Sequence, residues 1–139
     1  MPLSSDNLLK QLNQRKIIDW ALELNNGPES YQFLLTALKE DCLNINQTRN
    51  ALHALFRIRR HGDSAEVLHA FVESAKNPIL GIRSEAIQLV IGVVKFSHLY
   101  PEPRKLQLSK DQLRTIKGAR IAGLSRKVER LAADFFDKQ

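Results

Sequence analysis

The sequence contains little cysteine and no long apolar run, and both absences limit where the protein works. Cys42 is the only cysteine, so the chain forms no internal disulfide and offers no pair of thiolates to a metal ion. No uninterrupted apolar stretch approaches the roughly 20 residues of a membrane-spanning helix. The first residues also lack the basic and apolar segments of a secretion signal. We therefore expect a cytoplasmic protein without a membrane association.

Motifs for catalysis and for cofactor binding are also missing. The four histidines, His53, His61, His69 and His98, have no companions at a metal-ligand spacing. The chain has neither a glycine-rich phosphate loop nor a serine-nucleophile motif, and its acidic residues are scattered. We expect no catalytic residues, no cofactor and no bound metal, and hence a protein that is not an enzyme.

Positive charge is concentrated in the carboxy-terminal part of the chain. The formal net charge is +6, from 21 Lys and Arg against 15 Asp and Glu. Residues 1–100 hold 11 of these cations and 10 of the acids, whereas residues 101–139 hold 10 cations and 5 acids. Such an excess attracts phosphates or an acidic protein, although moderate positive charge also keeps a small domain soluble. The sequence leaves both interpretations open.

Apolar residues recur every three or four positions along most of the chain, which gathers them on one face of a helix. No stretch sustains the alternation of a β-strand. Helices are predicted over residues 5–24, from Pro28, after Asn46, from Asp63, over 79–96, from Ser109 and over 124–135. A proline-containing loop is expected over 98–108. The sequence thus predicts an all-α protein.

The helix over 79–96 is expected to be the centre of the core. Its residues Ile82, Ala86, Leu89, Val90 and Val93 share one side, and further apolar residues cover the others. The last helix is marked by the helical spacing of Leu124, Val128, Leu131, Ala132 and Phe135. We expect a single helical domain over 1–139, with an N-terminal helix within 1–27 and helix pairs over 28–62, 63–97 and 109–137.

Polar residues mark where several of these helices begin and end. Asp63 and Glu66 have the spacing of a capping box, and Ser109 and Gln112 have the matching arrangement before the sixth helix. The third helix is expected to end in the basic run 59–62, because cations near a carboxyl end are followed there by a glycine.

One stretch resembles a known helical repeat. Residues 77–90 are similar to the start of the second helix of a HEAT repeat, in which a turn residue and a proline precede a hydrophobic residue, an arginine and a small residue. Here these are Asn77-Pro78, Ile82-Arg83 and Ala86. Thr48-Arg49 takes the matching place one unit earlier, and a degenerate third unit would include residues 126–131.

The HEAT resemblance implies a fold and a class of function. It implies antiparallel helix pairs stacked as a short α-solenoid, with the second helices lining a concave binding surface. It also implies a scaffold or adaptor for proteins, since only a minority of such repeats bind nucleic acid. A compact helical bundle remains the alternative fold.

A first basic group lies in the third helix. Arg49, His53, Arg57 and Arg60 follow one another at steps of four, four and three, which predicts one exposed face. Arginine suits an acidic partner or a row of phosphates, because its fork of donors matches both groups. The alternative is a solvated face on which Arg49 and Arg83 act as ion-pair partners between repeats.

A second basic group spans the last two helices. It comprises Arg114, Lys117, Arg120, Arg126, Lys127 and Arg130. No aromatic residue is interleaved with these cations, so the base stacking used by single-stranded nucleic acid is not indicated. From both groups, the predicted partner-binding residues are Arg49, His53, Arg57, Arg60, Arg120, Arg126, Lys127 and Arg130.

These patterns favour a non-catalytic module that binds another macromolecule. We expect a protein–protein interaction adaptor or regulator whose partner is another, acidic protein. The alternative is a nucleic-acid-binding helical domain that uses its basic surface. Leu99 and Tyr100 offer a contact element on the long loop, whereas Trp20 and Cys42 are expected in the core.

Overall fold

The computed structural model describes residues 27–40, 43–97 and 106–137. The predictions for the helix over 5–24, for Trp20, Cys42, His98, Leu99 and Tyr100 lie outside the described residues. The described part contains α3 (Gly27–Glu40), α4 (Ile45–Arg57), the short 3-10 helix η1 (Arg59–His61), α5 (Ser64–Ser74), α6 (Leu80–Lys95), α7 (Lys110–Ala122) and α8 (Arg126–Phe136). No strand occurs in these ranges, so the all-α prediction is confirmed.

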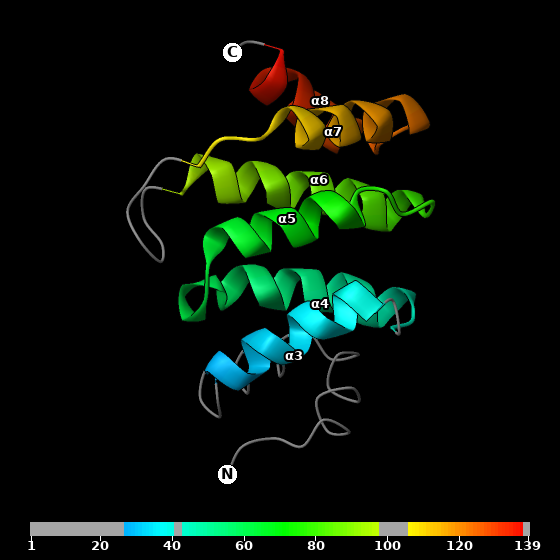
Figure 1. The fold of residues 1–139 in the computed structure, drawn as a ribbon. Helices are drawn as coiled ribbons and strands as arrows, with labels where there is room; N and C mark the ends of the chain where they lie inside the picture. The colour runs from blue at the N-terminus through cyan, green and yellow to red at the C-terminus, as the bar shows by residue number, and fades with distance from the viewer. Residues whose placement is uncertain (1–26, 41–42, 98–105, 138–139) are drawn as a thin grey trace.

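The helices form antiparallel pairs that are stacked in chain order (Figure 1). Within pairs, α3 packs on α4 and α5 packs on α6. Between pairs, α3 contacts α5 and α5 contacts α7, while α4 contacts α6 and α6 contacts α8. The first helices therefore make one layer and the second helices make the other. The pair α7–α8 lies at one end of the stack, and no described element lies beyond it (Figure 1).

The core is built around α6, as the sequence predicts. Ile82, Ala86, Leu89, Val90 and Val93 are all buried, because α6 packs against α4, α5 and α8 at once. None of the described helices has the length and apolar character needed to cross a bilayer.

The last helix is only partly buried. Val128 and Ala132 are buried, but Leu131 is 36% exposed. α8 packs on α6, and no further pair among the described residues covers its outward side.

The predicted helix starts are partly confirmed. Before α7, the Gln112 N–H donates to Ser109 Oγ at 3.1 Å and the Ser109 N–H donates to Gln112 Oε1 at 2.9 Å, which is a complete capping box. Asn44 and Gln47 make a second box, so α4 begins at Ile45 and not after Asn46. Both boxes satisfy backbone donors that the first helical turn leaves without partners.

At the start of α5, only half of the predicted box forms. Asp63 caps the helix by accepting the Ala65 N–H at 2.8 Å. The Asp63 N–H, which Glu66 would bind in a box, donates instead to the Tyr31 hydroxyl oxygen at 3.1 Å. Tyr31 in turn donates to Glu66 Oε1 at 3.2 Å. Glu66 therefore helps to tie α3 to α5.

The basic run after α4 does not extend that helix. α4 ends at Arg57, and residues 59–61 form η1. Arg59 folds back, with its guanidinium 4.1 Å from the centre of the Phe56 ring and its Nη1 donating to the Phe56 carbonyl oxygen at 2.7 Å. α4 thus ends two residues before the run in which the sequence predicts its end, and Arg59 there bonds the carbonyl of the last turn and stays buried.

The turn at Gly62 gives a testable consequence of this packing. A Cβ at position 62 would collide with the Tyr31 ring. We expect Gly62→Ala to lower the free energy of unfolding by about 1–3 kcal/mol, as overpacking does. At Gly81 in α6, an added Cβ would have no atom within 4 Å. Gly81→Ala should therefore raise the free energy of unfolding by about 0.5–1 kcal/mol. Urea denaturation measures both, and two effects of the same sign would contradict this packing.

Candidate binding surface

Two residues of the first basic group converge on one acidic side chain of α6. Arg49 Nε and Nη2 both donate to Glu85 Oε1, at 3.0 and 2.6 Å. His53 Nε2 lies 3.1 Å from Glu85 Oε2. The Glu85 side chain is only 15% exposed. Arg49 and His53 thus join α4 to α6, which for Arg49 is the inter-pair role that the sequence offered as the alternative to partner binding.

The environment of Glu85 changes its affinity for a proton. Burial raises the pKa of Glu85, but the bonds from His53 and Arg49 outweigh burial and lower the pKa from 4.5 to about 2. The folded pKa is thus below the unfolded pKa. The stabilisation from this charge is fully present above about pH 4.5 and is lost as the pH falls toward 2.

This shift predicts a pH-dependent effect of removing the charge. We expect Glu85→Gln to be less stable than the wild-type protein at pH 7, and the difference to shrink as the pH falls from 4.5 toward 2. Asp111→Asn is the matched control, since Asp111 is 89% exposed and pairs with Arg114, a neighbour on its own helix. Urea denaturation at several pH values tests this. A gap for Glu85→Gln that stays constant across that range would contradict the role of its charge.

The other two residues of the first group lie on different elements. Arg57 is the last residue of α4, whereas Arg60 belongs to η1. The prediction that Arg49, His53, Arg57 and Arg60 share one exposed helical face is therefore wrong, because the helix ends before Arg60. Both Arg57 and Arg60 are exposed, and neither is without a partner in the chain.

Arg83 holds the second and third pairs together. Its side chain is buried, with Nε donating to the Gly123 carbonyl at 2.7 Å and Nη2 to the Ala122 carbonyl at 3.4 Å. Its Nη1 donates to the carbonyls of Asn77 and Pro78 at 3.2 and 3.0 Å. Arg83 thus bonds backbone carbonyls at the α7–α8 turn, so the expected ion pair is replaced by hydrogen bonds.

Arg120, a predicted partner-binding residue, links the last two helices. Its guanidinium donates to Glu129 Oε1 at 2.9 Å and to both carboxylate oxygens of Asp137 at 2.9 and 3.0 Å. The bonds to Asp137 and Glu129 raise the pKa of Arg120, and the bond from Arg120 lowers the pKa of Asp137. Arg120 is thereby committed to holding α7 and α8 in a fixed relation.

The remaining cations cluster on a surface that we call the end face. It consists of the outward residues of α7 and α8, namely Lys110, Leu113, Arg114, Lys117, Ile121, Arg126 and Arg130. Steps of three and four place the α7 members on one side of that helix, away from the buried Ile116 and Ala119. On α8, two arginines four residues apart lie away from the buried Val128 and Ala132.

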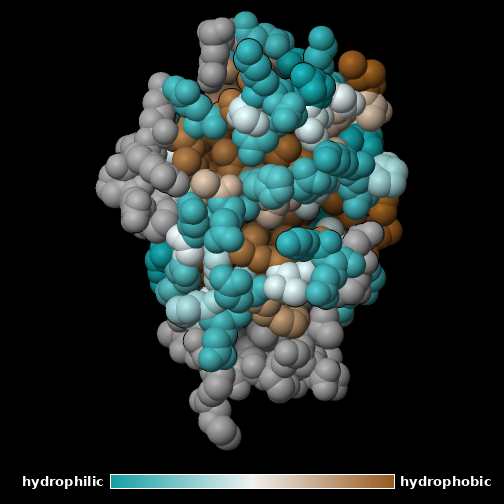
Figure 2. Space-filling view, viewed as in Figure 1, coloured by the Kyte–Doolittle hydropathy of each residue, from teal (hydrophilic) through white to brown (hydrophobic). Residues whose placement is uncertain are grey.

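The end face combines charge with exposed apolar groups. Ile121 is 78% exposed and Leu113 is 44% exposed. Within the described residues, no side-chain hydrogen bond or ion pair is found for Lys110, Lys117, Arg126, Lys127 or Arg130. Figure 2 shows the mixture at the top of the molecule, over α7 and α8, where hydrophilic side chains surround smaller hydrophobic areas.

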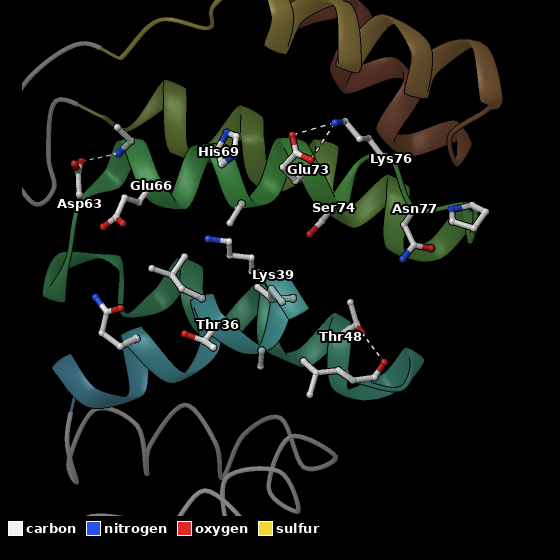
Figure 3. A pocket seen from close by; sticks show the side chains of 18 residues that line it. Thr36, Lys39, Thr48, Asp63, Glu66, His69, Glu73, Ser74, Lys76 and Asn77 are labelled. Atoms are coloured by element: carbon white, nitrogen blue, oxygen red, sulfur yellow. Dashed lines mark hydrogen bonds and ion pairs between the residues drawn. The ribbon is translucent and has the colours of Figure 1, made fainter. Parts of the chain in front are cut away.

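A groove lies elsewhere, between α3 and α5 (Figure 3). It encloses about 930 Å³. Glu73 pairs with Lys76 at its rim, and Asp63 caps α5. The labelled polar side chains are spread along the groove and do not converge on one point (Figure 3). In the described part of the chain, no three His, Cys, Asp or Glu side chains are placed to hold a metal ion.

Comparison of the chain with protein-family models, with curated proteins and with solved structures finds no match. The HEAT resemblance therefore stays a prediction.

Proposed function

We propose that the protein is a non-catalytic binding module, an adaptor or regulator that holds another protein through its end face. The observation that carries this proposal is the exposure of Ile121 and Leu113, at 78% and 44%, among cations of which only Arg114 has an ion-pair partner in the described residues. Apolar side chains rimmed by polar ones are typical of protein–protein contact sites.

The division of the cations supports a partner of opposite charge. One set of cations pairs with carboxylates within the chain, namely Arg49, His53 and Arg120. A second set pairs with no carboxylate among the described residues, namely Lys117, Arg126, Lys127 and Arg130. The electric field of the cations in this second set is available to attract an incoming acidic molecule. Such fields steer association and fix the register of the complex.

The acidic side chains support a role without catalysis. Glu85, Glu129 and Asp137 each hold a cation, and Glu73 pairs with Lys76. A general acid or base needs a position in which it reaches a substrate, and these carboxylates are engaged in ion pairs. Glu85, Glu129 and Asp137 join neighbouring helices.

Nucleic acid is the second candidate partner. The cations of the end face without intrachain partners could also contact phosphates, since phosphate contacts dominate nucleic-acid affinity. The exposed Ile121 and Leu113 favour the protein partner, because contacts with a phosphate backbone need no apolar anchor.

Charge reversal on the end face tests the proposal. The partner is captured after nuclease treatment and then purified. We expect the triple variant Lys117→Glu/Arg126→Glu/Arg130→Glu to bind it at least tenfold more weakly, which is about 1.4 kcal/mol. The fold should persist, because all three side chains are exposed. Isothermal titration calorimetry gives the affinities, and circular dichroism checks the fold.

A matched control separates the position of the charges from their number. Lys39→Glu/Arg57→Glu/Lys95→Glu makes the same change of net charge on exposed residues of α3, α4 and α6, and it should leave the affinity within about twofold. Equal losses in the two triple variants would refute the end face as the site. Capture of nucleic acid alone, with affinity that falls linearly on a log–log salt plot, would replace the protein partner by nucleic acid.

A further inference from the structure

Inside the stack, each helix pair accepts the next pair of helices on its outward side. α5 contacts α7, and α6 contacts α8. The pair α7–α8 also consists of two antiparallel helices, with no described element on the outward side (Figure 1). Helices pack by fitting ridges of side chains into grooves. The shape that fits this end of the stack is therefore another helix.

The apolar side chains of the end face are spaced for such a helix. Leu113 and Ile121 lie on one side of α7, with Lys117 between them. Eight residues of helix correspond to about 12 Å at 1.5 Å per residue. A partner helix with apolar residues seven or eight positions apart, on one face, matches that separation. Leu113 and Ile121 are then the anchors that leave solvent on binding.

The positive charge around Leu113 and Ile121 indicates which side chains flank the apolar residues of the partner. Lys110 and Lys117 flank the anchors on α7, and Arg126 and Arg130 flank them on α8. Among the nearby carboxylates, Glu129 and Asp137 are bound to Arg120 and Asp111 is paired with Arg114, while Asp134 is also engaged in an interaction. A partner that brings Asp or Glu to its flanks pairs with these cations, whereas a basic one is repelled.

A second copy of the chain is a poor occupant for the same reason. A symmetric contact brings the same patch of both copies together. The cations Lys117, Arg126 and Arg130 of one end face would then lie against the cations of the other, and like charges in contact oppose association.

From these observations we infer that the end face binds an acidic amphipathic helix of another protein, which lies along α7 and α8 with its apolar side on Leu113 and Ile121. This inference rests on the proposed function and names the class of partner.

A displayed library of helical peptides of about five turns tests the inference. Apolar residues are fixed on one face, and each flanking position encodes Glu, Lys or Ser. Selection on the wild-type protein should enrich peptides with Glu at the flanks. The enriched peptides should bind Leu113→Ser/Ile121→Ser at least tenfold more weakly than wild type, because both anchors are lost.

Two controls make this result specific. Ile45→Ser/Leu80→Ser replaces two apolar side chains of comparable exposure, 51% and 49%, on α4 and α6, and should leave binding unchanged. A peptide of the same composition, reordered so that its apolar residues no longer share a face, should lose binding. Fluorescence anisotropy measures all of these affinities.

Each alternative outcome overturns the inference in a distinct way. Equal binding of the reordered peptide would show attraction by net charge alone. Enrichment of Lys-rich peptides, or no enrichment, would exclude an acidic helix. Concentration-dependent dimers that Ile121→Ser abolishes, seen by sedimentation velocity, would identify a second copy as the occupant.

The failure of the inference can be told from the failure of the proposed function. If the purified partner is lost on charge reversal but no acidic helix is enriched, the binding function stands and only the class of partner is wrong. If acidic helices bind but charge reversal leaves the affinity for the purified partner unchanged, the proposed site of function is wrong.

Discussion

Replacing Leu89 with Ala is expected to lower the free energy of unfolding by about 2–5 kcal/mol, the largest effect that we predict for a single side chain. Leu89 lies in the middle of α6 and is 6% exposed. Because α6 contacts α4, α5 and α8, the surrounding helices cannot all move to fill the space that the substitution leaves. Urea denaturation followed by circular dichroism measures the change.

The same substitution at Leu80 is the matched control. Leu80 lies on the same helix but is 49% exposed, so Leu80→Ala should change stability by less than about 0.5 kcal/mol. An effect below about 0.5 kcal/mol for Leu89→Ala would show that α6 is not the centre of the core.

The second large effect is expected at the seam between α6 and the last pair. Arg83→Met keeps most of the buried stem of the side chain but removes the donors to the carbonyls of Gly123, Ala122, Asn77 and Pro78. We expect it to lower the free energy of unfolding by about 2–4 kcal/mol, because the carbonyls lose charge-assisted bonds at a buried site. Arg114→Met, at a side chain 79% exposed, should cost less than about 0.5 kcal/mol.

Hydrogen exchange gives a more local measure of Arg83→Met. If Arg83 holds α7 and α8 on the stack, the amides of these two helices should lose protection more than the amides of α4 and α5. A uniform loss of protection, or none, would contradict a specific role at the seam.

Local sequence patterns predict the helices because the relevant contacts lie close along the chain. The box of Ser109 and Gln112 spans three residues, and the apolar spacing of α6 follows from the geometry of a single helix. The end of α4 is missed for a local reason as well, since Arg59 finds the Phe56 carbonyl and ring within three residues. The spacing of apolar residues does not show that this bond from Arg59 competes with continuation of the helix.

The long-range roles of charged residues could not be predicted in the same way. Arg49 and Glu85 are 36 residues apart, and Arg83 and Gly123 are 40 apart. Which of them meet depends on how one pair is seated on the next. Glu85, the partner of two predicted site residues, carries no signal of its own in the sequence. Arg120 looks like Arg126 in the sequence, yet only Arg120 faces two carboxylates.

The apolar members of the end face were overlooked although a signal exists. Leu113 and Ile121 occupy the same helical side as Lys110, Arg114 and Lys117. An apolar residue on a basic stripe indicates a surface that partners cover.

Amide NMR of the protein with its purified partner tests the central claim most directly, because it locates the contact without any substitution. We expect the largest chemical-shift changes at Leu113, Lys117, Ile121 and Arg130, with small changes along α3 and α4. Large changes along the groove between α3 and α5, or around His53 and Arg57, with α7 and α8 unaffected, would contradict the end face as the binding surface.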